Sequence, residues 1–293
     1  MGMPPAPDLS YGPQAPVSEP PAHYPPGYRP EPARKRPLWR RAGGAILAGG
    51  LLVLKFGAKL KGLLLLLPKV KLFTTSASML VSIGAYTLIW GWRFALGFVV
   101  LMLIHEMGHV LQLRREGIPA TAVMFVPFLG AYVGMKEMPK DAAAEARVGL
   151  AGPVLGSLGA LLPLAIYAAT GEELFKALAF VGFFLNLFNL LPVLPLDGGR
   201  AMGALSPAIW LVGFAGLVVL AFVAPNPILL LILLLGGWET WRRWKARKDP
   251  ESQAYHRVPT RSRLAIAAVY IGLAVTLALG MDATFIERDF GDV

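Results

Sequence analysis

Apolar stretches of membrane-spanning length recur along the chain, and they constrain its fold more than any other feature. A helix crosses the hydrocarbon layer with about 20 mostly apolar residues, because the layer is roughly 30 Å thick and each residue rises about 1.5 Å. The chain is 55% hydrophobic and only 16% charged. Seven stretches approach the required length, at 75–91, 93–113, 147–169, 174–192, 201–223, 226–240 and 264–281. The sequence therefore predicts an all-α polytopic membrane protein with about six to seven transmembrane helices.

The composition also limits the partners and sites that the chain can have. It contains no cysteine, so disulfides and thiolate metal sites are excluded, and any metal must be held by histidine and carboxylate. The formal net charge is +10. Basic segments between apolar spans are more typical of the cytoplasmic side of a bilayer than of nucleic-acid binding. We therefore expect the lipid bilayer as a partner and no nucleic acid.

The two ends of the chain differ from its apolar middle. Of the 25 prolines, 12 lie in the first 40 residues, so residues 1–41 are predicted to be a disordered, cytoplasmic Pro-rich tail. In segment 42–73 lysines interrupt Leu-rich runs, which favours helices lying at the membrane interface. A true span at 42–67 is the alternative. Residues 282–293 form an acidic tail.

The distribution of lysine and arginine predicts how the chain is oriented. With seven crossings, a cytoplasmic N-terminus leaves only Arg93, Lys176 and Arg288 outside, and the positive-inside rule favours this arrangement. The C-terminus is then extracytoplasmic. Residues 206–281 are predicted to hold additional transmembrane helices around a basic cytoplasmic loop at 241–263.

A polar motif, HEMGH, interrupts the apolar stretch 93–113. His105 and His109 are four residues apart, so on a helix both imidazoles project from nearly the same face and can reach one ion. Glu106 lies about 100° round from His105, where its carboxylate can contact a metal-bound water and act as general base. A polar cluster that only joins helices is the alternative. Because ionisable groups in a membrane are costly, we favour a metal site.

A catalytic zinc needs a third protein ligand, and in this chain a carboxylate is expected. Asp197 stands out in the run NLFNLLPVLPLDGGR, residues 186–200. Pro192 and Pro195 disfavour a continuous helix before it, and two glycines after it permit a tight turn. Capping of the next helix is the alternative role for Asp197. Both 93–113 and 174–192 run toward the cytoplasm, so the topology places HEMGH and Asp197 at the same membrane face.

The two motifs together resemble the site-2 protease family of intramembrane zinc metalloproteases. The resemblance covers roughly residues 75–205, including the segment AGPVLG at 151–156, and predicts an intramembrane metalloprotease core at 74–205. It implies one zinc ion per chain, with His105, His109 and Asp197 as ligands and Glu106 as catalytic base. Asn189, at the family's asparagine position, is implied to hydrogen-bond substrate backbone or the developing oxyanion. Many family members carry a PDZ or CBS domain, for which the loops here have no room.

A segment rich in β-formers lies between the first motif and the next span. In TAVMFVPFLGAYVGMKE, residues 121–137, such residues flank Pro127 and Gly130, which predicts a short β-hairpin-like element. An exposed strand edge near Gly130 would bind an unwound substrate helix by main-chain hydrogen bonds. A loop that only packs against the protein is an equal alternative.

The sequence thus predicts a zinc endopeptidase that hydrolyses peptide bonds in or next to transmembrane segments of membrane proteins, near the cytoplasmic face. Two other classes of function use the same residues. A transporter or ion pathway would place ionisable groups at a broken helix, but it predicts inverted repeats, and the sequence has no convincing ones. A scaffold without catalysis would have no need of Glu106. Neither the substrate nor the oligomeric state follows from the sequence.

Overall fold

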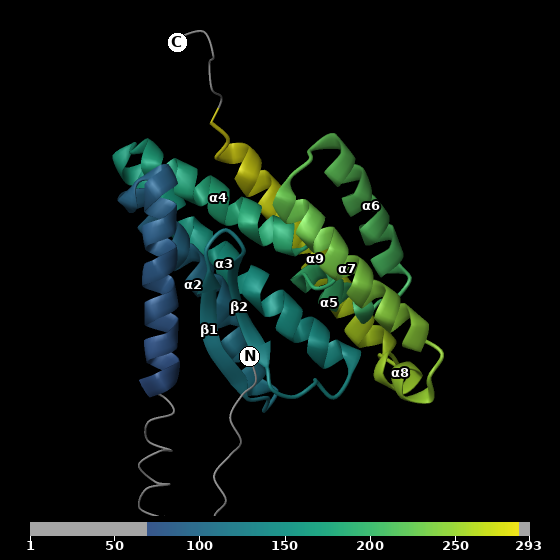
Figure 1. Cartoon of the computed structure of the whole chain (residues 1–293). Coiled ribbons are helices and arrows are strands. Elements are labelled where there is room, and N and C mark those ends of the chain that lie inside the picture. The colour runs from purple at the N-terminus through teal and green to yellow at the C-terminus, as the bar shows by residue number, and fades with distance from the viewer. Residues whose placement is uncertain (1–68, 287–293) are drawn as a thin grey trace, which may run out of the picture. The chain divides into compact units, whose positions relative to one another are not determined.

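The computed structural model describes residues 69–286, which belong to one compact unit of the chain and are mostly helical (Figure 1). The predicted Pro-rich tail 1–41, the alternative span 42–67 and the end of the acidic tail lie outside these residues. Residues 69–73, predicted to be interfacial, are the first residues of a helix that runs from Lys69 to Trp90. This helix continues from the interfacial segment directly into the first predicted span.

Four helices of the described region are long and apolar enough to cross a membrane. They are the helix Lys69–Trp90, α2 (Trp92–Arg115), α3 (Ala142–Thr170) and α9 (Thr260–Ala283). The prediction of mostly helical structure is therefore confirmed, and four of the predicted spans have a helix of membrane-crossing length and apolarity, fewer than the six to seven predicted. Three more predicted spans contain helices that are shorter or partly charged, namely α4 (Glu173–Asn189), α6 (Ile209–Val223) and α7 (Pro227–Ala246).

The structure gives different bounds to the helices in two predicted segments. Stretch 201–223 is not one helix, because α5 (Asp197–Gly203) ends before a turn and α6 begins at Ile209. Pro207 in this turn has no N–H to continue a helix. The predicted loop 241–263 is largely helical, since α7 extends to Ala246 and α8 spans Pro250–Tyr255. Side-chain pairs between Glu239 and the arginines that follow it support the last turns of α7.

The predicted hairpin between the two motifs is confirmed. Strands β1 (Ala120–Val126) and β2 (Gly130–Met135) pair antiparallel, with Val123 opposite Val133 and Val126 opposite Gly130. The connection turns sharply, because Phe128 (φ 66°) and Gly130 (φ 98°) both adopt positive φ. The hairpin shares a hydrophobic core with α2 and the helix Lys69–Trp90. It therefore lies against the helix that carries HEMGH.

Helix α3 is the central element of the described region, in contact with α2, α4, α5 and α9 (Figure 1). It begins at Asp141, whose carboxylate accepts a hydrogen bond from the Ala144 N–H, and it ends at Gly171 in the left-handed conformation. Small residues let its neighbours approach closely. A side chain at Gly108 of α2 would collide with the carbonyl of Ala151 in α3, so these two helices meet where HEMGH lies.

Candidate active site

The two histidines of HEMGH face the same side of α2 and are both buried. Their Nε2 atoms are 3.2 Å apart. Each Nδ1 atom contacts a different acceptor at 2.8 Å, His105 the side-chain oxygen of Asn186 and His109 the backbone carbonyl of Val148. Because these oxygens only accept, each Nδ1 donates, and each Nε2 of the neutral ring carries a lone pair.

Asp197 reaches the same point from a distant part of the chain. The segment after α4 leaves helical geometry through Pro192 and Pro195 and re-enters it at α5, of which Asp197 is the first residue. The Asp197 Oδ2 atom lies 3.1 Å from Nε2 of His105 and 3.1 Å from Nε2 of His109. Leu196, not Asp197, occupies the N-cap position of α5. The Asp197 carboxylate is thus directed at the histidines and not at the end of α5.

These three atoms form a donor set that fits a zinc ion. With both rings in the neutral tautomer that their Nδ1 contacts favour, two imidazole lone pairs and a carboxylate oxygen converge, which is unfavourable unless a cation lies among them. Ligands of tetrahedral zinc at about 2.0–2.1 Å from the metal are about 3.3 Å from one another. The observed separations of 3.1–3.2 Å are close to this value. His105, His109 and Asp197 are therefore able to hold a metal ion.

Glycines make room for this cluster. A Cβ atom on Gly152 of α3 would collide with the His109 ring and would lie 2.8 Å from Nε2 of His105. In the segment that carries Asp197, a Cβ atom on Gly198 would collide with the carbonyl of Leu190, and one on Gly199 would collide with the backbone of Val193. The turn around Asp197 is therefore tightly closed. Gly152 belongs to the AGPVLG segment, for which the sequence offers only a family resemblance. Its missing side chain is what lets α3 approach both imidazoles.

Glu106 lies beside the cluster but does not belong to the donor set. It is 6% exposed, and it lies on α2, which packs against β2. Its place between the hairpin and the cluster is suited to a general base acting on a water between metal and substrate.

Two other predicted site residues make no hydrogen bond to the cluster within the described residues. Asn189 is the last residue of α4, and its amide donates to the Leu185 carbonyl at 3.0 Å within the same helix. Gly130 is the first residue of β2, with no heavy atom within 4 Å of where its Cβ would lie. Sequence reasoning missed Asn186, which contacts His105. The available signal was a second asparagine in an otherwise apolar stretch, one helical turn before Asn189.

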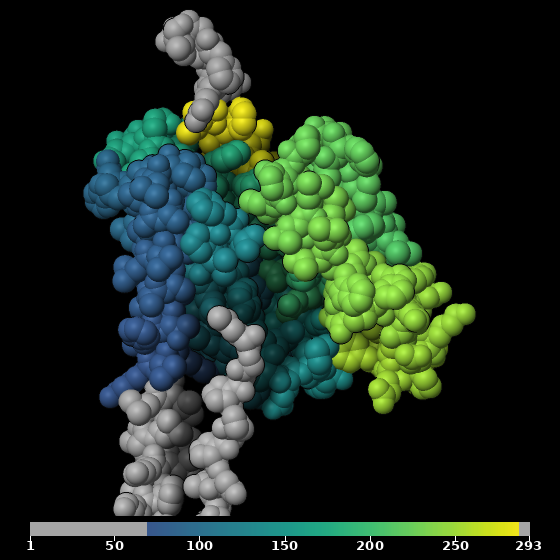
Figure 2. Space-filling view, viewed as in Figure 1, coloured from purple at the N-terminus to yellow at the C-terminus, as the bar shows by residue number. Residues whose placement is uncertain are grey.

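A hollow adjoins the segment that carries Asp197. Its volume is about 240 Å³, and it lies between the Leu194–Pro195 segment and α7. In Figure 2 the surface is hollowed beside the light-green α7. Charged side chains line it, among them Arg200, Glu239 and Arg243. The Arg200 guanidinium also contacts the sulfur of Met135 at the end of β2, so this side chain links the hollow with the hairpin.

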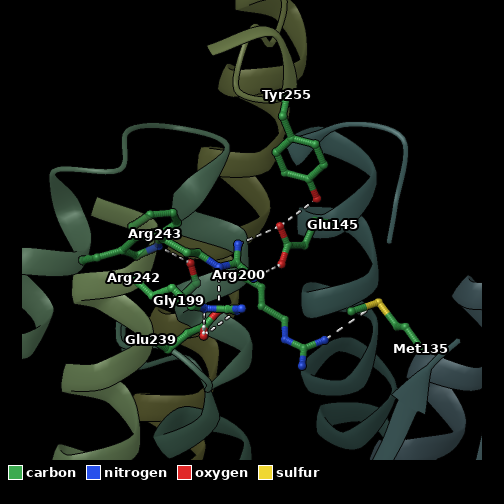
Figure 3. A network of polar contacts seen from close by, with 9 residues as sticks. Met135, Glu145, Gly199, Arg200, Glu239, Arg242, Arg243 and Tyr255 are labelled. Carbon is green, nitrogen blue, oxygen red and sulfur yellow. Dashed lines mark hydrogen bonds and ion pairs between the residues drawn. The ribbon is translucent and has the colours of Figure 1, made fainter. Parts of the chain in front are cut away.

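A buried ion network fixes α7 and α8 next to the site (Figure 3). The Glu145 carboxylate, in the first turn of α3, accepts hydrogen bonds from Arg243 at 2.9 and 3.1 Å. It also accepts one from the Tyr255 hydroxyl at 2.8 Å. Burial and the adjacent Glu145 carboxylate raise the pKa of Tyr255, so the hydroxyl keeps its proton and donates. Arg243 in turn donates to Glu239 on its own helix.

Replacing Arg243 with leucine is expected to destabilise the fold by about 3–5 kcal/mol, because Glu145 would remain charged and buried without its main partner. The measurement is the free energy of unfolding in detergent. Adding Glu145→Leu to this variant should restore much of the loss, since the unpaired charge is then gone. Arg93→Gln is the control, because the Arg93–Glu172 pair is exposed and should contribute only about 0–1 kcal/mol. A loss as small as that of the control would show that the buried network contributes little.

The fold and the site define a class of protein, with membrane-spanning helices around a His-His-Asp group that has a glutamate beside it. The model of Peptidase family M50 matches residues 93–176 and 165–213, which contain all of these site residues. The similarity to the site-2 protease family that HEMGH and the Asp197 motif predicted is thus confirmed. It extends over the helices from α2 to the start of α6.

Three relatives are similar to part of this chain. Zinc metalloprotease MJ0392 of Methanocaldococcus jannaschii is 30% identical over 129 residues, 42% of this chain. The putative zinc metalloprotease Rip3 of Mycobacterium tuberculosis is 33% identical over 149 residues, 45% of this chain. The putative zinc metalloprotease sll0528 of Synechocystis is 31% identical over 126 residues, 38% of this chain. The aligned part covers 37%, 37% and 32% of these relatives, so the chain matches about a third of their length.

Proposed function

We propose that this protein is an intramembrane zinc endopeptidase that cleaves membrane proteins in or next to their transmembrane segments, near the cytoplasmic face. The observation that carries the proposal is the convergence of His105 Nε2 and His109 Nε2 from α2 with Asp197 Oδ2 from α5, within 3.1–3.2 Å of one another. Relatives named zinc metalloproteases support zinc as the ion.

In this proposal the chain's own residues divide the hydrolytic reaction among them. A zinc ion, when bound, supplies Lewis acidity that polarises a carbonyl and acidifies water. His105, His109 and Asp197 hold it. Glu106 takes the proton of the attacking water and passes it to the leaving amine. Asn189 turns its amide away from the Leu185 carbonyl and donates to the oxyanion.

The proposed orientation rests on the number of crossings and on the distribution of lysine and arginine. Seven crossings with a cytoplasmic N-terminus place the arginines at the end of α2, Arg114 and Arg115, inside. HEMGH then lies in the cytoplasmic part of α2, where water reaches it from that side. The finer count of spans, which includes α4, α6 and α7, belongs to this proposal.

Removal of the metal tests the proposed function directly. The full chain, reconstituted in vesicles with a candidate single-span membrane protein, should cleave it, and a zinc chelator should stop the reaction. Adding zinc back should restore cleavage. Cleavage that survives complete removal of zinc would contradict the proposal.

We further propose that the substrate binds as a strand at the outer edge of β2. The opposite edge of the hairpin is already occupied, because the helix Lys69–Trp90 covers β1. Thr75 donates to the Val123 carbonyl at 2.8 Å, and the Phe125 N–H donates to the Ser78 hydroxyl at 3.2 Å. In an antiparallel pair the residues opposite these two, Val133 and Ala131, direct their backbone groups to the other edge.

This outer edge leads to the catalytic base. β2 packs against α2, which carries Glu106, so a peptide added along β2 would pass near that carboxylate. Gly130 begins the edge with open space at its Cβ position. An extended substrate also exposes its scissile carbonyl, which a helix would shield. The edge thus supports the substrate-binding role predicted for the Gly130 region.

Replacing Ala131 with proline should lower cleavage by at least about 10-fold and leave zinc binding intact. Proline removes the outward N–H that a substrate strand would use, a hydrogen bond of about 1–1.5 kcal/mol, and its ring obstructs the edge. The measurement is kcat/KM together with bound zinc. Ala131→Ser is the matched control, because it keeps the N–H and a small side chain. Equal activities of the two variants would exclude strand addition at this edge.

A further inference from the structure

Asn186 makes the most completely specified polar contact around the candidate zinc site. It lies on α4, is 2% exposed, and its Oδ1 atom is 2.8 Å from Nδ1 of His105. Its Nδ2 atom donates to the carbonyl of Gly182, one turn earlier, at 2.7 Å. A carbonyl only accepts, so this second bond fixes which end of the amide faces His105. The oxygen faces the imidazole, and the imidazole must donate.

This arrangement sets both the tautomer and the direction of the His105 ring. With the proton held at Nδ1, the lone pair lies at Nε2, which points toward Oδ2 of Asp197 at 3.1 Å. A ring free to rotate would lose this alignment. His109 has the same arrangement through the backbone carbonyl of Val148. Of the two histidines, only His105 has a side chain as the acceptor of its Nδ1 proton.

The neighbouring helix is shaped around the Asn186 amide. A Cβ atom on Gly156 of α3 would lie 2.7 Å from the Cγ and 2.7 Å from the Nδ2 of Asn186. Gly152, one turn earlier on α3, gives the same clearance to the imidazoles. The glycines of one helix thus accommodate both the histidines and the residue that orients one of them.

We propose that Asn186 is a positioning residue for the zinc site, which holds His105 in the tautomer and orientation that binds the metal. The inference rests on the proposed zinc site. Side chains that orient metal-binding histidines typically contribute about 10- to 100-fold to metal affinity. The same contribution is expected of Asn186, because no other side chain of the described residues hydrogen-bonds Nδ1 of His105.

Two variants of similar size separate positioning from packing. Asn186→Leu fills the space but cannot accept the Nδ1 proton, and it should weaken zinc binding by about 10- to 100-fold. Asn186→Asp loses the bond to Gly182 but keeps the oxygen that accepts the Nδ1 proton. Its zinc dissociation constant should therefore stay within about 3-fold of that of the unchanged protein. The zinc dissociation constant of the full chain in detergent is measured by chelator competition. The thermal midpoint of the zinc-free form reports stability separately.

The control replaces the other asparagine of the same helix. Asn189→Leu should leave the zinc dissociation constant unchanged, because Asn189 contacts its own helix and not a histidine. Zinc binding by Asn186→Leu that equals that of the unchanged protein would overturn the inference. A loss of zinc affinity of more than about 10-fold in Asn186→Asp would also overturn it. If the leucine variant fails to fold, the Asn186→Asp result alone is the test. An unchanged protein that binds no zinc would instead refute the proposed function.

Discussion

Replacing Glu106 with glutamine is expected to stop peptide cleavage while the zinc stays bound. Glutamine keeps the size of the side chain and its place against β2 but cannot accept the proton of the attacking water. General acid–base groups contribute about 10²- to 10⁴-fold to rate, so kcat should fall by that factor. The metal should remain because Glu106 lies outside the donor set of His105, His109 and Asp197.

The measurement combines a cleavage assay in vesicles with determination of bound zinc on the same preparation. Glu116→Gln is the control for loss of a glutamate, because Glu116 lies beyond the end of α2 and pairs with Arg147. It should retain cleavage. Transport without cleavage that depends on Glu106 would favour an ion pathway, and full cleavage by Glu106→Gln would remove the proposed base.

Gly152→Ala is expected to disable the site with a single added methyl group. The new Cβ would collide with the His109 ring and lie 2.8 Å from Nε2 of His105. Overpacking of this kind costs about 1–3 kcal/mol, equivalent to roughly 5- to 150-fold weaker zinc binding if the rings move to relieve it. When the zinc concentration is limiting, the rate of cleavage should fall in proportion to the zinc that is lost. Helix propensity alone would make the same change favourable by about 1 kcal/mol.

The matched control for this substitution is Gly272→Ala in α9, where no heavy atom lies within 4 Å of the new Cβ. It should bind zinc and cleave as the unchanged protein does. The zinc dissociation constants of the two variants give the comparison. Equal constants would mean that α3 does not approach the imidazoles as closely as this structure has it.

The parts of the site that share a short-range pattern were accessible from the sequence. Helical spacing alone places His105 and His109 on one face. Asp197 was found because an acid after Pro192 and Pro195 is unusual at membrane depth, and the structure brings it to both histidines. The hairpin followed from β-formers around a proline and a glycine. In each case one local property, periodicity or backbone restriction, was sufficient.

Other features depend on distant contacts that no local pattern encodes. Asn186 lies one turn before Asn189, and only the packing of α4 on α2 makes it the residue that meets His105. The partners Glu145 and Arg243 are 98 residues apart, so their pairing could not be read from composition. Hydropathy also predicts a single span at 201–223, which includes the end of α5 and all of α6, because an apolar pattern does not indicate the turn at Pro207.

The proposed function depends on one zinc ion held by His105, His109 and Asp197. Anomalous diffraction at the zinc absorption edge from crystals of the active protein locates this ion. A single peak per chain is expected, about 2.0–2.1 Å from the Nε2 atoms of both histidines and from a carboxylate oxygen of Asp197. A peak at other residues, or an active protein with no zinc peak between these three side chains, would contradict it.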